Sequence, residues 1–528
     1  MQTEPQVLIV GAGPSGLVLA LFLARFGIPF RIIDKEMQAG TTSRALIVHA
    51  RTLEFYRQLG IADDVVQSAQ KFVAVNLWVN AKPRARLAFG DIGATLSKYP
   101  YSLIFPQDKH EQILIQALRK HGIEVERDCD LVALETGCEH ITGSIRRADG
   151  TTEQCEVAYV AGCDGAHSTV RETVKIGLPG GTYSHLWYVA DVDYAGSLTA
   201  NEVYISMDRR DALALFPMRE AGRARVVGQA PPKPDDSPIA WDDVSVRVVK
   251  ELRTQVRDVH WFSTYRVHHR VAEHFRAERV FLVGDAAHLH SPVGGQGMNT
   301  GIGDAVNLAW KIAAVLRGQS SPELLDSYEP ERIRFARGLV ASTDRMFSVL
   351  NSKSPGAGLF RTFVAPTFLP PLLRLGSARA TAFRILSQTS IEYRNSPLSQ
   401  GRVGCLRAGD RLPFAQFPSM PDGDNFAPLN TIDWQVHVYG EPSTSLHKTC
   451  EVHGLPLHAF MWQSELHSTG LRENALYLVR PDGHVAFAHP TDDAAALERY
   501  LLGSPAFITR VPHWKEPADA SPSFDGGR

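Results

Sequence analysis

The chain begins with a pattern of apolar and polar positions that predicts a buried strand, a tight turn, a helix and a second strand. Val7 to Val10 is an apolar run without polar interruption, which is typical of a strand buried on both faces. The sequence Gly-Ala-Gly-Pro-Ser-Gly follows at 11–16. Residues 17–26 then carry apolar side chains at helical spacing up to Gly27, where a glycine would end the helix. Residues 30–34 form a second apolar run that ends in an acid.

This order of strand, glycine turn, helix, strand and acid matches the dinucleotide-binding fingerprint. The first glycine permits the tight turn, the second lets a pyrophosphate approach the backbone, and the third lets the helix pack closely on the strand. The free N–H groups at the helix N-terminus would bind the pyrophosphate, and the acid would accept hydrogen bonds from ribose hydroxyls. The residues of this predicted site are Gly11, Gly13, Pro14, Ser15, Gly16 and Asp34.

Two other interpretations of this stretch compete with a nucleotide site. Residues 7–24 are apolar enough for a signal peptide or a membrane span, but Glu4 and Pro5 stand where a signal peptide needs basic residues. A strand–turn–helix that binds nothing is the second alternative, and the later motifs argue against it. We therefore expect a nucleotide site and no membrane span.

Similar apolar runs recur further along the chain. Residues 159–162 and 280–283 each lead into a small or acidic turn, Asp164-Gly165 and Gly284-Asp285 respectively. Between these runs, residues 183–265 alternate between apolar and polar side chains. This alternation predicts a β-sheet on the substrate side, inserted into the nucleotide-binding domain.

The last third of the chain follows a different pattern. Residues 363–375 are apolar and rich in proline, so they predict either a lid over a pocket or a linker packed on the core. From about residue 401, strands and a turn at 481–483 indicate a separate small α/β domain, and Thr491 would cap its last helix. The polar tail after Trp514 is typical of disorder.

Composition narrows the class of protein. A chain of 528 residues is too long for one core and implies two or three domains. Hydrophobic residues make up 44% and the net charge is −2, which is typical of a globular chain and gives no electrostatic reason to expect nucleic acid or an anionic membrane as a partner. The six cysteines form no C-x-x-C pair and the histidines no metal-ligand pattern, so we expect a cytoplasmic protein with reduced thiols and no metal.

The three turn motifs together resemble those of the FAD-dependent aromatic hydroxylases, the single-component flavoprotein monooxygenases related to para-hydroxybenzoate hydroxylase. Residues 11–16 match that family's glycine motif, 163–171 its Asp-Gly motif and 284–299 its Gly-Asp motif. The likeness is greatest to the subgroup with a C-terminal thioredoxin-like domain, which contains phenol hydroxylase, hydroxyphenylpropionate hydroxylase and the polyketide hydroxylases. It is strong over about residues 5–400 and loose over the remainder. The segments that carry the subgroup likeness are 43–45, 49–54, 106–107 and 270–272.

The resemblance implies an α/β fold with an α+β insert: a Rossmann-type FAD-binding domain, an inserted substrate-binding β-sheet domain and a C-terminal thioredoxin-like domain. Because the last domain has no C-x-x-C, assembly or cover for the active site is a better expectation for it than disulfide exchange. The predicted boundaries are 1–400 for the monooxygenase unit (FAD-binding 1–72, 101–182 and 267–345; substrate-side sheet 73–100 and 183–266; helical or lid region 346–400), 401–513 for the thioredoxin-like domain and 514–528 for a disordered tail.

The resemblance also assigns roles to side chains. Asp285 would accept hydrogen bonds from ribityl or ribose hydroxyls, unless it is only an ion-paired turn residue. Arg44 would lie near the diphosphate or in front of the flavin as the one catalytic candidate, unless it is a solvated loop arginine. Gln107 would contact the ribityl chain, and Asp164 would be partly structural. The family usually has Glu at the position of Asp34, so the ribose contact would be looser here or mediated by water.

A helix beginning at about Thr300 would direct backbone N–H groups at the pyrimidine edge of the flavin and stabilise the negative charge of its reduced form. The glycines that precede this helix would let the backbone approach the flat ring closely. The complete set of FAD contacts that the resemblance implies is Gly11, Gly13, Pro14, Ser15, Gly16, Asp34, Lys35, Arg44, Gln107, Val132, Asp164, Asp285, Pro292, Gly295, Gly297, Met298 and Asn299.

The implied reaction is hydroxylation of a phenolic or polyketide-type aromatic compound by way of a flavin C4a-hydroperoxide, with NADPH or NADH and dioxygen as co-substrates. There is no second dinucleotide fingerprint, so NAD(P)H would bind only transiently. Baeyer–Villiger or epoxidising oxygen insertion, flavin dehydrogenation or oxidation, and a flavin-binding scaffold without activity remain open alternatives, as does a homodimer.

The substrate side is less well defined by the sequence. Phe216, Pro217, Trp187, Tyr188 and the 363–375 segment suggest a large apolar pocket. No catalytic base can be named. Four polar residues are candidates by position, although each residue type is more often structural on a sheet. They are Tyr204, Arg219, His185 and Arg270.

Overall fold

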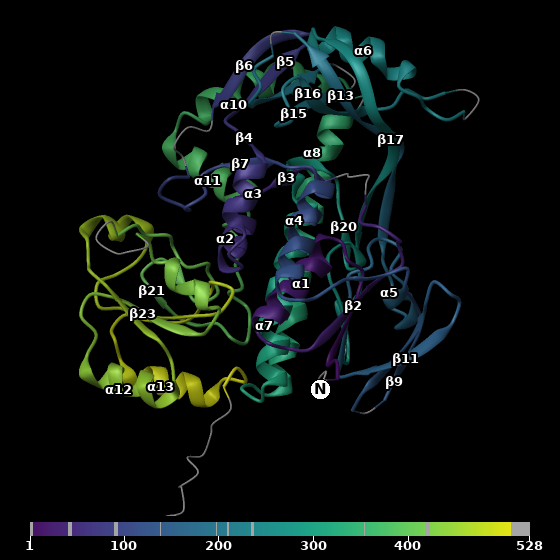
Figure 1. Cartoon of the computed structure of the whole chain (residues 1–528). Helices are drawn as coiled ribbons and strands as arrows, with labels where there is room; N and C mark the ends of the chain where they lie inside the picture. The colour runs from purple at the N-terminus through teal and green to yellow at the C-terminus, as the bar shows by residue number, and fades with distance from the viewer. Residues whose placement is uncertain are drawn as a thin grey trace, which may run out of the picture.

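The structure in Figure 1 is a computed structural model that describes residues 4–40, 45–88, 93–137, 139–196, 198–208, 211–233, 237–352, 354–417 and 423–507. A six-stranded sheet forms the base of the part in which the sequence predicts a nucleotide site, and we call it the nucleotide-binding part. The strand order is β18-β19-β12-β1-β2-β8, and every pair is parallel except the antiparallel edge pair β18–β19. This agrees with the predicted α/β class. The strands are β1 (Val7–Val10), β2 (Phe30–Asp34), β8 (Glu126–Arg127), β12 (Tyr159–Gly162), β18 (Arg276–Ala277) and β19 (Val280–Leu282).

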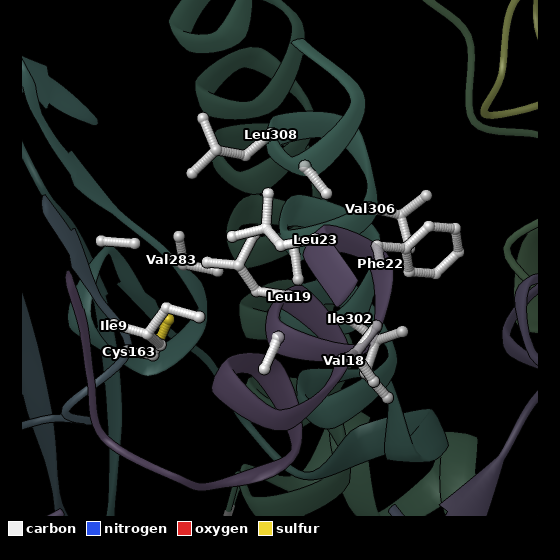
Figure 2. Packing of buried hydrophobic residues seen from close by; sticks show 14 of the residues in the cluster. Ile9, Val18, Leu19, Phe22, Leu23, Cys163, Val283, Ile302, Val306 and Leu308 are labelled. Atoms are coloured by element: carbon white, nitrogen blue, oxygen red, sulfur yellow. The ribbon is translucent and has the colours of Figure 1, made fainter. Parts of the chain in front are cut away.

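Three helices cover this sheet: α1 (Pro14–Arg25), α4 (Gln107–Lys120) and α7 (Gly297–Leu316). Figure 2 shows the packing of α1 against α7 and against the strands below them. The central strands β1, β12 and β19 are buried throughout and carry no charged residue, as expected of strands covered on both faces. The buried side chains labelled there are Ile9, Val18, Leu19, Phe22, Leu23, Cys163, Val283, Ile302, Val306 and Leu308.

The second large sheet has eight strands in the order β20-β17-β13-β16-β15-β14-β5-β6. It lies at the other end of the molecule from β9 (Asp130–Thr136) and β11 (Thr152–Val157) (Figure 1). It contains the segment in which alternation predicted an inserted sheet. Its strands are β5 (Ala74–Val79), β6 (Lys82–Ala88), β13 (Gly180–Ala195), β14 (Glu202–Met207), β15 (Ala212–Pro217), β16 (Arg223–Gln229), β17 (Gln255–Val271) and β20 (His288–Leu289).

The two faces of this sheet have different partners. Tyr188 packs in a cluster with Val244 and Val248 of α6 (Asp242–Leu252). The preceding residue, Trp187, packs on the opposite face, because successive side chains of a strand alternate. The prediction that Trp187 and Tyr188 line one pocket is therefore wrong.

A long helical excursion connects the nucleotide-binding part to the C-terminal part. It comprises α8 (Tyr328–Asn351), α9 (Pro355–Leu359), a π-helical turn η4 (Phe360–Val364), α10 (Ala365–Leu372) and α11 (Gly376–Leu386). The proline-rich stretch is thus helical, with two prolines inside α10. No helix in the described ranges is long and apolar enough to cross a membrane.

The remaining elements are shorter. Two three-stranded sheets have the orders β11-β10-β9 and β3-β7-β4. The elements are β3 (Ile47–Val48), β4 (Gln70–Phe72), β7 (Ser102–Ile104), β9 (Asp130–Thr136), β10 (Ile141–Arg146), β11 (Thr152–Val157), α2 (Ala50–Gln58), α3 (Ala62–Ser68), α5 (Thr169–Thr173), and the 3-10 helices η1 (Gly284–Ala286), η2 (Val293–Gly295) and η3 (Pro322–Ser327).

The C-terminal part is a mixed sheet in the order β22-β21-β26-β25-β23-β24 with two helices. Parallel strands β23 and β24 are joined through α12, and antiparallel strands β25 and β26 lead into α13. The elements are β21 (Gln400–Val403), β22 (Leu406–Arg407), η5 (Ala427–Thr431), β23 (Gln435–Tyr439), α12 (Thr444–His453), β24 (Leu457–Phe460), η6 (Ser464–Thr469), β25 (Leu476–Val479), β26 (Val485–His489) and α13 (Ala494–Gly503).

Buried ion pairs attach this part to the helices of the nucleotide-binding part. Arg480 contacts Glu331 of α8 at 2.7 Å and Asp482 at 2.5 Å, and Lys311 of α7 contacts Glu331 at 2.8 Å. All four side chains are at most 2% exposed. Burial lowers the pKa of Lys311 to about 8. Burial alone would raise the pKa of Glu331, but the adjoining cations hold it well below its usual range.

Two sequence-based expectations about helix ends are wrong. Helix α7 begins at Gly297 and not at about Thr300, so it starts inside the glycine-rich loop. The N-cap of α13 is Asp493, whose carboxylate accepts a hydrogen bond from the Ala496 N–H, and not Thr491. Both errors concern helix ends, where local sequence signals overlap.

Candidate cofactor site

The glycine turn after β1 has the geometry that a bound diphosphate requires. Gly11 has φ +100°, and a Cβ there would collide with the Cys163 carbonyl. A Cβ at Gly16 would collide with the Gly11 carbonyl, so this glycine allows α1 to pack against the turn. Gly13 is the N-cap of α1, and a Cβ at this residue would meet nothing within 4 Å. No side chain caps α1 and its first turn has no acid, so the N-terminus of this helix suits an anion.

Asp34 braces this turn from the end of β2. Its Oδ2 accepts a hydrogen bond from the Ala12 N–H at 2.6 Å, and its Oδ1 accepts one from the Glu36 N–H at 2.8 Å. The side chain is 14% exposed. The carboxylate thus holds the glycine turn in addition to the ribose role that the sequence suggested. Lys35, the next residue, is exposed.

Two charged residues that the sequence did not single out lie next to Asp34. Arg127 of β8 is in register with Asp34, its Nη1 lies 3.6 Å from the Asp34 carboxylate, and its Nη2 is buried without a hydrogen-bond partner. Glu111 of α4 is 4% exposed, and its Oε1 accepts a hydrogen bond from Gln107 Nε2 at 2.8 Å. Burial raises the pKa of Glu111 to about 7. Gln107 Oε1 also accepts a hydrogen bond from the Ala45 N–H at 3.4 Å.

The Gly-Asp turn after β19 is held from below by a buried carboxylate. Asp304 of α7 accepts hydrogen bonds from the Gly284 N–H at 3.1 Å, His288 Nε2 at 2.7 Å and Arg332 Nε at 2.5 Å. Although burial opposes it, Arg332 and His288 hold the pKa of Asp304 below its ordinary value, so the carboxylate is ionised. Asp285, the second residue of this turn, is exposed and follows the carboxyl end of β19.

The other two predicted motifs meet this turn. A Cβ at Gly284 or Gly301 would collide with the Ser15 side chain, which places Ser15 between the Gly-Asp turn and α7. Arg171, from the Asp-Gly motif, donates to the Ala286 carbonyl at 3.0 Å. Asp164 accepts a hydrogen bond from the Val170 N–H at 3.0 Å, and burial raises its pKa. The three motifs are therefore in contact with one another.

The glycine-rich loop of residues 292–299 is clamped by Asn299, which is 1% exposed. Its Nδ2 donates to the carbonyls of Ile47 and Gly295 at 2.8 and 2.9 Å. Its Oδ1 accepts from the His49 N–H at 3.0 Å and from Thr52 Oγ at 2.7 Å. The side chain is fully engaged within the protein, so the backbone N–H is what Asn299 can offer to a ligand.

His49 holds the loop from the same side. Burial lowers the pKa of His49 to about 4, so the ring is neutral at pH 7. Its Nε2 lies 2.9 Å from the Gly294 carbonyl and must therefore carry the proton, while Nδ1 accepts from Ser102 Oγ at 3.2 Å. Gly294 and Gly295 have φ +78° and +62°, conformations that favour glycine.

The N-terminus of the helix that follows the loop presents backbone donors. Helix α7 begins at Gly297 without a side-chain cap, and its first turn has no acid. The N–H groups of its first residues, Met298 and Asn299 among them, have no partner within the helix. Pro292 precedes the loop's 3-10 turn, and Met298 is partly buried against the core. This is the arrangement that a flat ring bearing negative charge would need.

Apolar clusters of the eight-stranded sheet adjoin this loop. Trp187 packs in one cluster with Phe347 of α8 and Val293 of the loop. Phe216 packs in a second cluster with Ile47, whose side chain a Cβ on Gly295 would strike. Aromatic side chains of the sheet therefore reach the loop by two routes.

The other predicted residues are less informative. Arg44 lies outside the described residues. Val132 is 40% exposed on β9. The four polar candidates of the substrate side have other surroundings. Tyr204 packs in the cluster under α6 and its hydroxyl accepts from the Thr199 N–H, and Arg270 donates to Thr182. His185 lies beside Ser184, and Arg219 is exposed.

Comparison with known proteins shows which family the chain resembles. The family described as FAD binding domain matches residues 4–343. The 6-methylpretetramide 4-monooxygenase of Streptomyces rimosus is 35% identical over 412 residues, which is 75% of this chain and 71% of that protein. The pentachlorophenol 4-monooxygenase of Sphingobium chlorophenolicum is 31% identical over 425 residues, 78% of this chain and 76% of that protein.

Solved structures give the same result over nearly the whole chain. The anhydrotetracycline hydroxylase from Streptomyces rimosus superposes with a TM-score of 0.75 at 28% identity and covers 94% of this chain and 98% of its own. The flavin-dependent monooxygenase PieE, in complex with FAD and substrate, has a TM-score of 0.77 at 23% identity and covers 95% and 100%, which shows the shared fold.

Proposed function

The chain belongs to the family of FAD-dependent aromatic hydroxylases, and on that premise we propose that it uses NAD(P)H and dioxygen to hydroxylate a phenolic or polyketide-type aromatic compound. The observation that carries this proposal is the meeting of three motifs at one sheet edge, where two helix N-termini and a clamped glycine loop offer backbone donors. The names of related monooxygenases support the substrate class.

The residues present fit FAD, and each part of the cofactor has a proposed holder. The open space at Gly13 suits the diphosphate, and Asp34 with Arg127 suits the adenosine ribose. In this proposal Gln107 and Asp285 would hold the ribityl chain, and the N-terminus of α7 would bind the pyrimidine edge. When bound, FAD supplies the redox chemistry that reduces dioxygen at the expense of NAD(P)H.

The chain's own groups would prepare the site for that chemistry. The first N–H groups of α7 stabilise negative charge on a reduced ring, because they lie at the positive end of the helix dipole. Asn299 and His49 keep these donors in place by fixing the loop. The cluster of Trp187, Phe347 and Val293 would exclude water from one side of the loop. A dry site favours transfer of oxygen to the substrate over its release as peroxide.

The C-terminal part supports this unit in our proposal. Its β-α-β and β-β-α halves, β23-α12-β24 and β25-β26-α13, share one mixed sheet, which supports a thioredoxin-like unit. We infer a bracing role for it, since it has no C-x-x-C and its Arg480 is buried against Glu331 of α8. The predicted domain boundaries, the homodimer and the cytoplasmic location stay predictions.

The proposed activity is tested by measuring NAD(P)H oxidation, oxygen uptake and peroxide release by the FAD-loaded protein with a panel of phenols and aromatic polyketides. We expect ligand-accelerated oxidation with little peroxide and a product that carries oxygen from ¹⁸O₂. Peroxide release without product would indicate an oxidase. A protein that takes up FAD but that no aromatic compound accelerates would refute hydroxylation for that panel.

A further inference from the structure

Exposed apolar side chains concentrate in one part of the molecule. Nineteen large hydrophobic residues are exposed in the described ranges, and ten of them lie between Met346 and Leu386. The ten include all three exposed phenylalanines, Phe360 at 41%, Phe363 at 56% and Phe368 at 60%. Single exposed apolar residues are ordinary on a protein surface, but such a concentration marks an interaction site.

This surface is a built part of the fold. It consists of the end of α8, then α9, the π-helical turn, α10 and α11, and α10 lies beside β6, the edge strand of the eight-stranded sheet (Figure 1). Arg361, which is fully buried, anchors it by donating to the carbonyls of Asp208 on the sheet side and of Val349 and Ser352 at the end of α8. The apolar side chains are therefore presented on a fixed framework.

The same segment is basic throughout. Between Asp344 and Glu392 the sequence contains no acidic residue and six basic ones, although the whole chain has a net charge of −2. Arg345, Arg374 and Arg384 are exposed. On the neighbouring strand β6, Lys82 and Arg84 are also exposed, and Glu202 of β14 is paired with Arg86. The overall charge balance hides this local excess.

We propose that this surface, residues 345–352 and 354–391 with strand β6, binds the headgroup region of an anionic lipid bilayer without spanning it. Phenylalanine and leucine side chains flanked by arginine are the combination that interfacial helices use, since the apolar groups enter the headgroup boundary while the cations bind anionic lipids. A second copy of the chain fits poorly, because a two-fold contact through this face would set arginines against arginines. The proposal is independent of the substrate that the cofactor site accepts.

The test is co-sedimentation of the FAD-loaded protein with vesicles of phosphatidylglycerol and phosphatidylcholine, and with vesicles of phosphatidylcholine alone. We expect binding to the anionic vesicles that weakens as NaCl is raised from low to high concentration. Each arginine near an anionic surface contributes about fivefold to affinity, so Arg374→Glu with Arg384→Glu should reduce binding by at least about 30-fold. Phe363→Ser with Phe368→Ser should reduce it at least about tenfold.

The matched control lies on α12 of the C-terminal part, where Val452 is 72% exposed and Lys448 is exposed. Val452→Ser with Lys448→Glu makes the same kinds of change and should leave vesicle binding unchanged. Flavin absorbance and melting temperature verify that each variant is folded. If the wild type ignores anionic vesicles at low salt, or if its binding does not respond to salt, the proposal is refuted whatever the variants do. Equal binding by the phenylalanine and control variants would also overturn it, as would concentration-dependent dimerisation in place of lipid binding.

Discussion

The clamp on the glycine-rich loop gives the sharpest prediction. Asn299→Ala removes two donors and an acceptor from a side chain that is 1% exposed. It leaves the carbonyls of Ile47 and Gly295, the N–H of His49 and the hydroxyl of Thr52 without this partner. Each buried polar group that is left without a partner costs about 1–3 kcal/mol, although water can enter part of the space. We therefore expect the free energy that favours the ordered loop to fall by about 2–4 kcal/mol.

That loss should appear in FAD affinity, because an ordered loop is needed to aim the donors of α7. Since about 1.4 kcal/mol corresponds to tenfold, the dissociation constant for FAD should rise at least about tenfold in Asn299→Ala. Thr52→Val removes one of the four hydrogen bonds and should give an intermediate value. The dissociation constant of the wild type and of both variants is measured by titrating the apoprotein with FAD and following the quenching of flavin fluorescence.

The matched control is Asn425, a buried clamp in the C-terminal part. Its side chain bonds to Pro413, Ala415 and Tyr439 at 2.7–2.8 Å and is fully buried. Asn425→Ala should lower the melting temperature without changing FAD affinity. A folded Asn299→Ala protein that binds FAD as tightly as the wild type would show that the loop does not need this clamp, and our account of the site would be wrong.

Three further predictions address other parts of the molecule. Gly13→Ala should leave the melting temperature of the apoprotein within about 2 °C of wild type, because a Cβ there meets nothing, yet weaken FAD binding at least about tenfold in the same titration. Glu111→Gln should raise the free energy of unfolding of the apoprotein in urea by up to about 3 kcal/mol at pH 8 and by less at pH 5. The sign follows because the pKa of Glu111 is raised from 4.5 to about 7 in the folded state, so the wild type loses stability as the pH rises between these values; an equal gain at both pH values would refute this. Arg480→Met should lower stability by about 3–5 kcal/mol in thermal unfolding, because it leaves Glu331 buried without one of its cations, and an unchanged melting temperature would contradict the bracing role.

The sequence predicted the nucleotide-binding framework well because its signals are local. The apolar runs of β1, β12 and β19 have no polar positions, and their turns need glycine for reasons that hold residue by residue, as the close approaches at Gly11 and Gly16 show. Helix α7 was placed three residues too late because Gly297 is a poor helix former in isolation. Burial of the following residues against α1 overrides that preference.

The parts of the site that escaped prediction depend on contacts between distant segments. The pairing of Arg127 with Asp34 requires the register of β8 on β2, two strands that are separated in the sequence by every element from β3 to α4. The role of Asp304 likewise appears only when α7 lies under the Gly-Asp turn and Arg332 of α8 lies beside it. No periodicity or spacing contains this information, because it arises from how sheets and helices pack.

The cofactor site has two layers, the backbone of the motifs and the buried side chains behind it. The residues of the motifs contribute through their backbone. Gly13 leaves space because it has no side chain, and Met298 and Asn299 present their N–H groups. The residues that hold this backbone are polar side chains buried behind it, such as Asp304 and His49. Because a buried carboxylate or amide without its partners is costly, changes in this supporting layer should damage the site as much as changes in the motifs themselves. The fold thus uses buried polar groups to aim backbone donors at one position, the edge where β1, β12 and β19 end.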